Sequence, residues 1–234
     1  MMTATENGRQ VTLGELFGAG VPAALAHRPV PAIAADSRRV GPGGLFLACA
    51  GERSHGLDYL ATALAGGAAF VAWEPVPGRE GPVLAPGAEC FPVPALGRRS
   101  GEIADRFFGQ PSAALDVIGI TGTNGKTTCT QLLARALEAV GRPAGVIGTL
   151  GAGRVGALAD LGYTTPDAVE LQPALAALRD GGAAVVTMEV SSHALAQART
   201  RGNRLPAAGY TNLSRDHLDY HGRLEAYAEA TLQL

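Results

Sequence analysis

The segment Gly122-Thr123-Asn124-Gly125-Lys126-Thr127-Thr128 constrains the fold of this chain more than any other. It follows residues 115–120, an apolar run typical of a buried strand, and it opens a helical pattern over residues 126–140. The backbone amides of such a turn surround phosphate oxygens, while a lysine reaches the outer phosphates and a threonine hydroxyl binds magnesium. The strict pattern has glycine where this chain has Ile120, so the sequence predicts a variant of the phosphate-binding loop.

Lys126 is the only lysine among the 19 basic residues, and the other basic residues are arginines. The ammonium of lysine is a compact point charge on a flexible stem, whereas the guanidinium of arginine is a larger planar group. A single lysine at this position therefore indicates a specific contact with phosphate and not only a positive charge. A glycine-rich turn without a ligand is the alternative interpretation. The position of the lysine disfavours it.

The apolar pattern predicts two α/β domains. Strands are expected at residues 31–35, 45–49 and 69–74, with helices at 58–65 and 96–108 and a loop at 78–94. Gln110, Pro111 and Ser112 interrupt the pattern, so we expect a small domain over residues 1–110 and a second over 114–234.

The second domain is predicted to hold a mainly parallel sheet, because strands and helices alternate along it. The expected strands are residues 115–120, 144–147, 183–190 and 208–211, and the expected helices are 126–140, 167–179, one after residue 190 and one from about 224. Ligands of such sheets bind at the carboxyl ends of the strands.

Composition excludes several classes of protein. The chain is 47% hydrophobic and 17% charged with a net charge of -2, so we expect neither disorder nor a basic surface for nucleic acid. No apolar run is long enough for membrane insertion, and residues 1–10 lack the pattern of a secretion signal, which predicts a cytoplasmic protein. Cys49, Cys90 and Cys129 are too far apart for a zinc site and are expected to be reduced and buried.

Two polar clusters follow predicted strands. Glu189, near the end of residues 183–190, is a candidate ligand for magnesium, although an ordinary acid at a strand end with Ser191 capping the next helix would give the same pattern. Residues 212–221 contain two histidines, two aspartates and an arginine, which suit either an active site or a solvated loop.

Three further segments have simple local explanations. A helix is predicted to start with Thr165 as its N-cap, Pro166 as its first residue and Asp167 in its first turn. This leaves Thr164 without a capping role. The turn after the first strand, 36–38, and the polar loop 51–56 are each compatible with turn chemistry alone.

Taken together, residues 36–38, 43–46, 121–128, 164–166, 189–193 and 212–221 resemble the motifs of the Mur ligases, most closely the MurE type, in the right order and over nearly the whole chain from about Ile33. The resemblance implies an enzyme of peptidoglycan synthesis that uses ATP and magnesium. Such enzymes phosphorylate the terminal carboxylate of a UDP-MurNAc-dipeptide, and the amine of an incoming amino acid, diaminopimelate or lysine, then displaces the phosphate to form an amide.

The resemblance also implies roles for individual residues. Lys126, Glu189 and His217 would be catalytic, and Thr127, Glu189 and His217 would surround the metal. Residues Gly122, Thr123, Asn124, Gly125, Lys126, Thr127 and Thr128 would bind ATP. The UDP part would contact Ala35, Ser37, Glu52, Arg53 and Ser54, and the muramoyl-dipeptide part would contact Thr164, Thr165, Ser191, Gln197 and Arg199.

The chain departs from the family pattern in two respects. A third domain that binds the amino acid is expected to be absent, and Thr231 stands where the family carries a carbamylated lysine that binds a second magnesium. We therefore expect a fragment of a ligase that does not complete the reaction by itself. The alternatives are a non-catalytic module that binds nucleotide and UDP-muramoyl-peptide, and an unrelated phosphate-loop kinase or GTPase.

Overall fold

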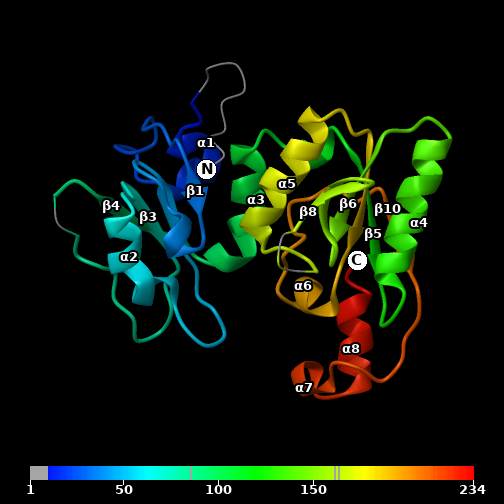
Figure 1. Cartoon of the computed structure of the whole chain (residues 1–234). Helices are drawn as coiled ribbons and strands as arrows, with labels where there is room; N and C mark the ends of the chain where they lie inside the picture. The colour runs from blue at the N-terminus through cyan, green and yellow to red at the C-terminus, as the bar shows by residue number, and fades with distance from the viewer. Residues whose placement is uncertain (1–9, 85, 161, 163) are drawn as a thin grey trace. The chain divides into compact units, whose positions relative to one another are not determined.

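Two units, Met1–Gly109 and Gln110–Leu234, divide the chain (Figure 1). The computed structural model describes residues 10–84, 86–160, 162 and 164–234. Each unit has its own sheet with helices, so the α/β class predicted from the sequence is confirmed. The division falls beside Gln110, where the apolar pattern of the sequence is interrupted.

The sheet of the first unit has four parallel strands in the order β1-β2-β3-β4. These strands are β1 (Ile33–Ala34), β2 (Leu45–Ala48), β3 (Phe70–Trp73) and β4 (Glu89–Pro92). The helices are α1 (Leu13–Phe17), α2 (Leu60–Ala65) and α3 (Leu96–Phe107), with 3-10 turns at Gly18–Gly20, Ser37–Arg39 and Gly56–Tyr59. Because the strands are parallel, the segments that follow their carboxyl ends lie along one edge of the sheet.

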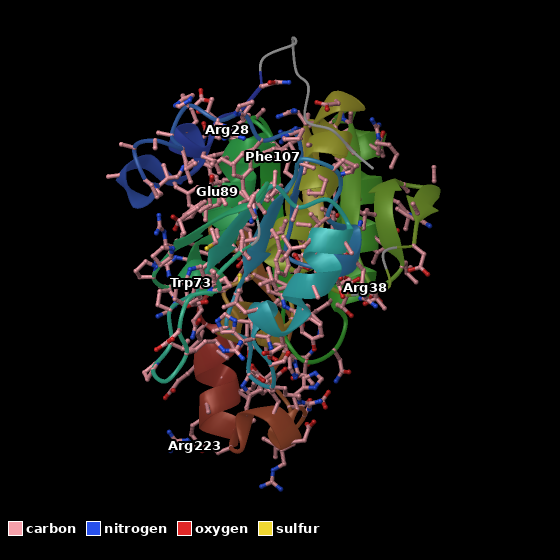
Figure 2. The ribbon with its side chains drawn as sticks, turned by 90° about the vertical axis from the view of Figure 1, so that its left-hand side faces the viewer. Arg28, Arg38, Trp73, Glu89, Phe107 and Arg223 are labelled. Atoms are coloured by element: carbon pink, nitrogen blue, oxygen red, sulfur yellow. The ribbon has the colours of Figure 1, made fainter. Side chains whose placement is uncertain are left out.

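Apolar and aromatic contacts hold helices and the segment containing Arg28 against this sheet. Phe46 of β2 and Ala63 of α2 belong to one buried cluster. The rings of Phe17 in α1 and Phe91 in β4 meet edge to face, with centroids 5.1 Å apart. Arg28, labelled in Figure 2, lies over the ring of Phe70 at 5.2 Å. These contacts give the first unit a core of its own.

The sheet of the second unit has six strands in the order β10-β5-β9-β6-β7-β8. They are β5 (Asp116–Thr121), β6 (Ala144–Gly148), β7 (Gly151–Arg154), β8 (Ala157–Ala159), β9 (Val185–Glu189) and β10 (Ala207–Tyr210). The helices are α4 (Lys126–Ala139), α5 (Ala168–Asp180), α6 (Ser192–Ala196), α7 (Leu218–His221) and α8 (Leu224–Thr231), with a 3-10 turn at Pro111–Ala113. Strands β10, β5, β9 and β6 are parallel, whereas β7 and β8 are antiparallel.

Strand β9 shows how the sheet directs its side chains. Val186 and Met188 belong to the buried cluster that includes Leu171 and Leu175 of α5. Side chains alternate along a strand, so Thr187 faces the other way, and its hydroxyl donates to the carbonyl of Thr130 in α4 at 3.0 Å. Glu189, two residues later, therefore shares the face on which α4 begins, and Figure 1 shows α4 and α5 on opposite sides of the sheet.

The predicted element boundaries need two corrections. Residues 78–94 contain β4, which pairs in parallel with β3 although the segment is rich in proline and glycine. Residues 148–166, where neither a helix nor a strand was predicted, contain the β7–β8 hairpin. Both strand runs are short, and β7 holds two glycines of positive φ, Gly151 and Gly153, so neither run gives a recognisable alternation of apolar residues.

The cysteines also differ from expectation. Cys129 is exposed, and Cys49 and Cys90 are only partly buried, so they are not core residues. All three lie in the described part of the chain, and none forms a disulfide. Among the described helices, none is both long enough and apolar enough to cross a bilayer.

Candidate functional site

The predicted phosphate-binding loop lies between the end of β5 and the start of α4. Gly122 and Gly125 have positive φ of 123° and 86°, which side chains rarely adopt. A Cβ at Gly122 would also overlap the hydroxyl of Thr211. In the described part of the chain no side chain caps the first turn of α4. The backbone amides at this helix start are therefore available to an anion.

The Lys126 ammonium lies over its own loop. Its Nζ donates to the carbonyl oxygens of Gly122 at 2.7 Å and Thr123 at 2.9 Å. Burial lowers the pKa of this ammonium, and the nearby carboxylates of Glu189 and Asp216 act in the opposite direction. The cation thus stands where phosphate oxygens would meet the loop.

The carboxylate of Glu189 is almost fully buried, with 1% of the residue exposed. It accepts hydrogen bonds from the Thr127 hydroxyl at 2.9 Å, the Thr149 amide at 3.0 Å and the Thr149 hydroxyl at 3.2 Å. All three donors are neutral groups. The Lys126 ammonium is a nearby positive charge, but it donates to the loop carbonyls and not to this carboxylate. A buried carboxylate is costly without a close counter-charge, so this arrangement favours a cation between Glu189 and the loop.

These groups converge because four parallel strands end at one edge. In the sheet register Ile120 pairs with Glu189, Ile147 with Met188, and Tyr210 with Thr121. The residues that follow these strands are therefore neighbours. The Asn212 side chain, for example, accepts from the amide of Asn124 at 3.2 Å.

The cap at the start of α5 was predicted wrongly. Asp167 is the N-cap, and its side chain accepts from the amides of Val169 and Glu170. Thr165 is buried two residues earlier, where it donates to the carbonyl of Glu189 at 3.0 Å and accepts from the amide of Ser191 at 3.1 Å.

The other residues predicted to hold the muramoyl-dipeptide gather around Thr165. Arg199 donates to the Thr165 carbonyl at 2.9 Å and also contacts the side-chain oxygen of Gln197. Ser191 caps α6, as the simpler interpretation of its motif predicted. Thr164 lies 3.1 Å from the Thr149 hydroxyl. The structure therefore brings all five predicted residues to the region beside Glu189.

His217 lies in an aromatic cluster. Its ring is 5.0 Å from that of His193 and 6.0 Å from that of Tyr227, measured between centroids. Burial lowers the pKa of His193 and of His221. Among the described residues, no group of three or more histidine, cysteine, aspartate or glutamate side chains is arranged to hold a metal ion by itself.

Tyr227 and Thr149 are site residues that the sequence did not reveal. Tyr227 is buried in α8, and its hydroxyl lies 2.9 Å from the hydroxyl of Thr123 in the loop. Both residues are isolated in sequence from any motif. The only available signal was position, since Thr149 directly follows the end of β6. Thr231 is also buried in α8, and its hydroxyl donates to carbonyls of its own helix.

The predicted UDP-binding residues lie at the carboxyl edge of the first sheet. Ala35 and the buried Ser37 follow β1, where Asp36 caps a 3-10 turn and pairs with Arg38 at 2.7 Å. The exposed residues Glu52, Arg53 and Ser54 follow β2. Their loop is closed by a hydrogen bond from the Gly51 amide to the Ser54 carbonyl.

Comparison with known families decides the wider relationship. Residues 29–107 match the Mur ligase family, catalytic domain, and residues 120–234 match the Mur ligase middle domain. This chain belongs to the Mur ligase family. The alternative of an unrelated phosphate-loop kinase or GTPase is therefore wrong.

Individual Mur ligases resemble the chain closely. A UDP-N-acetylmuramoyl-L-alanyl-D-glutamate-2,6-diaminopimelate ligase of Alkalilimnicola ehrlichii is 50% identical over 213 residues, covering 88% of this chain and 43% of that protein. The ligase of the same name from Pseudomonas aeruginosa is 45% identical over 229 residues, covering 96% and 45%. The chain thus spans a little under half the length of these relatives.

Solved structures agree with this relationship. The structure of a ligase of the same name superposes with a TM-score of 0.81 at 35% identity, covering 96% of this chain and 45% of that one. The MurF ligase from Thermotoga maritima in complex with ADP has a TM-score of 0.55 at 20% identity, covering 86% and 42%, and shows a shared fold alone.

Proposed function

We propose that this chain carries the nucleotide site and the UDP-substrate site of an ATP-dependent ligase that forms an amide in peptidoglycan precursor synthesis. The proposed reaction adds diaminopimelate to UDP-MurNAc-L-Ala-D-Glu. Family membership supports the reaction type, and the names of the relatives favour diaminopimelate over lysine. We place the reaction in the cytoplasm, where ATP is available.

The observation that carries the proposal is the pairing of the phosphate loop with the buried carboxylate of Glu189. A hydroxyl and a carboxylate are oxygen ligands, which Mg²⁺ prefers, and a nucleotide-bound Mg²⁺ takes further ligands from phosphate and water. Thr127 and Glu189 therefore fit the ion as it arrives with ATP. The family resemblance is the reason for proposing that His217 also lies close to the metal. When bound, magnesium would neutralise charge on the transferring phosphate.

The remaining loop residues would hold the nucleotide. Gly122, Thr123, Asn124 and Gly125 would line the phosphates together with Thr128 in the first turn of α4, where the helix start offers backbone amides. The amides of Thr123 and Asn124 already donate to Asn212, so these two residues would shape the loop. Lys126 would exchange its bonds to the loop carbonyls for bonds to the outer phosphates. Its positive charge would stabilise the transition state as the terminal phosphate leaves ADP.

The chemistry consists of two displacements. An oxygen of the substrate carboxylate attacks the terminal phosphorus of ATP, and ADP leaves. The amine of diaminopimelate then attacks the carbon of the resulting acyl phosphate, inorganic phosphate leaves, and the amine loses a proton as the amide forms. The first step brings two anions together, and the second releases an anionic phosphate. The positive charges of Lys126, Arg199 and the metal would stabilise both steps.

Two separate sets of residues are proposed for the two parts of the substrate. Ala35, Ser37, Glu52, Arg53 and Ser54 would hold the UDP part. Thr164, Thr165, Ser191, Gln197 and Arg199 would hold the muramoyl-dipeptide part. The hydrogen bonds that already join Arg199, Thr165 and Ser191 support this assignment, because they fix the group before a ligand arrives.

Calorimetric titrations with MgATP and with UDP-MurNAc-dipeptide test the proposal. Binding of both ligands is expected, and binding of neither would contradict it. A second function is a non-catalytic binding module. Thr231 favours it, because a buried threonine stands where the resemblance places a carbamylated lysine. Because the chain is not expected to complete the reaction by itself, ADP release is measured with both ligands, diaminopimelate and the amino-acid-binding domain of a relative supplied in trans. ADP release under these conditions would support the ligase, whereas binding of both ligands without ADP release would support the module.

A further inference from the structure

Thr149 holds both oxygens of the buried carboxylate. Its backbone amide donates to Glu189 Oε1 at 3.0 Å, and its hydroxyl lies 3.2 Å from Oε2. Oε2 is also the oxygen that accepts from the Thr127 hydroxyl at 2.9 Å. One residue at the end of β6 therefore sets the plane of the carboxylate and turns Oε2 towards the phosphate loop.

The backbone of β6 makes this contact possible. A Cβ at Gly148 would overlap the carboxylate of Glu189, so the carboxylate lies directly against the end of the strand. The absence of a side chain at Gly148 lets both the amide and the hydroxyl of the next residue reach it. Glu189 has little freedom to turn in this position.

The Thr149 hydroxyl also has a second neighbour, the Thr164 hydroxyl at 3.1 Å. A hydroxyl carries one proton, so Thr149 donates to either Glu189 or Thr164 at any moment. If a cation occupies Oε2, the proton of Thr149 is free to turn towards Thr164. A cation bound at Oε2 would thus change the hydrogen bonding of Thr164, which is one of the residues proposed to contact the muramoyl-dipeptide.

From these contacts we propose that Thr149 is a positioning residue, which orients the Glu189 carboxylate for a divalent cation and couples that carboxylate to Thr164. This inference rests on the proposed function, since it assumes that the nucleotide arrives with its metal. It assigns to Thr149 no bond to the reacting atoms.

Three substitutions separate the hydroxyl from the rest of the residue. Thr149→Val keeps the shape and the backbone amide but removes the hydroxyl, and we expect it to weaken MnATP binding about tenfold, as loss of groups that orient a metal ligand commonly does. Thr149→Ser restores the hydroxyl and is expected to restore affinity to within about twofold. Thr62→Val, at an exposed threonine of α2, is the matched control and is expected to bind as the unaltered chain does.

The affinity of the full 234-residue chain for MnATP is measured by water-proton relaxation, with Glu189→Gln as the reference for a lost ligand. Unchanged affinity in Thr149→Val together with weak binding in Glu189→Gln would overturn the inference and leave the proposed function standing. An unaltered chain that does not bind MnATP would overturn both.

A second measurement needs no ligand. Amide hydrogen exchange at position 149 is expected to speed up in Thr149→Val, because the carboxylate that accepts the amide is held less firmly. Unchanged exchange would contradict the positioning role. If Thr149→Val unfolds at a lower temperature than the unaltered chain, Thr149→Ala is judged by the same two criteria.

Discussion

Lys126 combines a partly desolvated ammonium with two backbone acceptors that a ligand can replace. We expect Lys126→Ala to weaken MgATP binding at least about tenfold, because one charge-assisted hydrogen bond contributes about 1.5–3 kcal/mol. Calorimetry measures the affinity, and urea unfolding measures the effect on the fold, which is expected to survive both this change and Lys126→Arg. Arg135→Ala, at an exposed residue of the same helix, is the control. Equal MgATP affinity in Lys126→Ala and the unaltered chain would refute the phosphate-loop assignment.

Tyr227 ties α8 to the loop through the Thr123 hydroxyl. Tyr227→Phe removes this bond and leaves the ring in place, so we expect a loss of about 1 kcal/mol in the free energy of unfolding and a several-fold weaker affinity for MgATP. Urea unfolding and calorimetry measure the two effects. Tyr210→Phe, at a tyrosine that is 46% exposed, should change neither. An effect of equal size in both variants would argue against a specific role for Tyr227.

Single residues show the limit of prediction from sequence. The phosphate loop was found because seven adjacent residues carry the signal. Thr165 and Asp167 are both good capping residues. Only the structure shows that Thr165 lies beside the end of β9, where its hydroxyl bonds Glu189 and Ser191 and does not cap the helix. Thr149 was missed because its role depends on β6 pairing with β9, a contact between segments 40 residues apart.

The short helices α6 and α7 are joined by histidines. His221 in α7 lies 3.0 Å from the Ser192 hydroxyl in α6, and burial lowers the pKa of both His193 and His221. In the unfolded chain these histidines bind protons with the ordinary pKa of about 6.5. The unfolded state therefore binds more protons between this value and the lower folded values, so stability is present above about pH 6.5 and is lost as pH falls.

Urea unfolding between pH 5 and 8 tests this prediction. The free energy of unfolding is expected to fall below about pH 6.5, and His221→Gln, which keeps a side-chain hydrogen-bonding group, is expected to flatten that fall. A steeper pH dependence in His221→Gln than in the unaltered chain would show that the sign is wrong.

Long, regular elements were predicted well, and so were the short strands β2, β6 and β10, whereas β4, β7 and β8 were missed. Helices α3 and α4 were placed to within a residue because each has an extended apolar spacing. Strand β4 ends in Pro92 and has only Phe91 fully buried, so its only clear evidence is the pairing with β3. Strand identity here is decided by a neighbour and not by the strand's own residues.

At the scale of the whole molecule, each unit carries its own sheet, and the predicted UDP contacts lie entirely in the first unit. We therefore expect residues 1–112, expressed alone, to keep measurable affinity for a uridine diphosphate sugar. Chemical-shift mapping should show changes near Ser37 and Arg53, which follow neighbouring parallel strands. A folded 1–112 segment with no response near either residue would contradict the assignment of the UDP site.

The order of strands in the second unit also determines when the candidate nucleotide site forms during folding. Thr127 meets Glu189 across 62 residues, and Thr123 meets Ser214 across 91. Such distant closures are entropically costly and come late, after the strands that bring them together have paired. A partly folded chain lacking β9 or β10 has no complete nucleotide site. If the proposed site binds nucleotide, the ligand would stabilise only the finished unit, and a nascent chain would acquire affinity for it in one step rather than gradually.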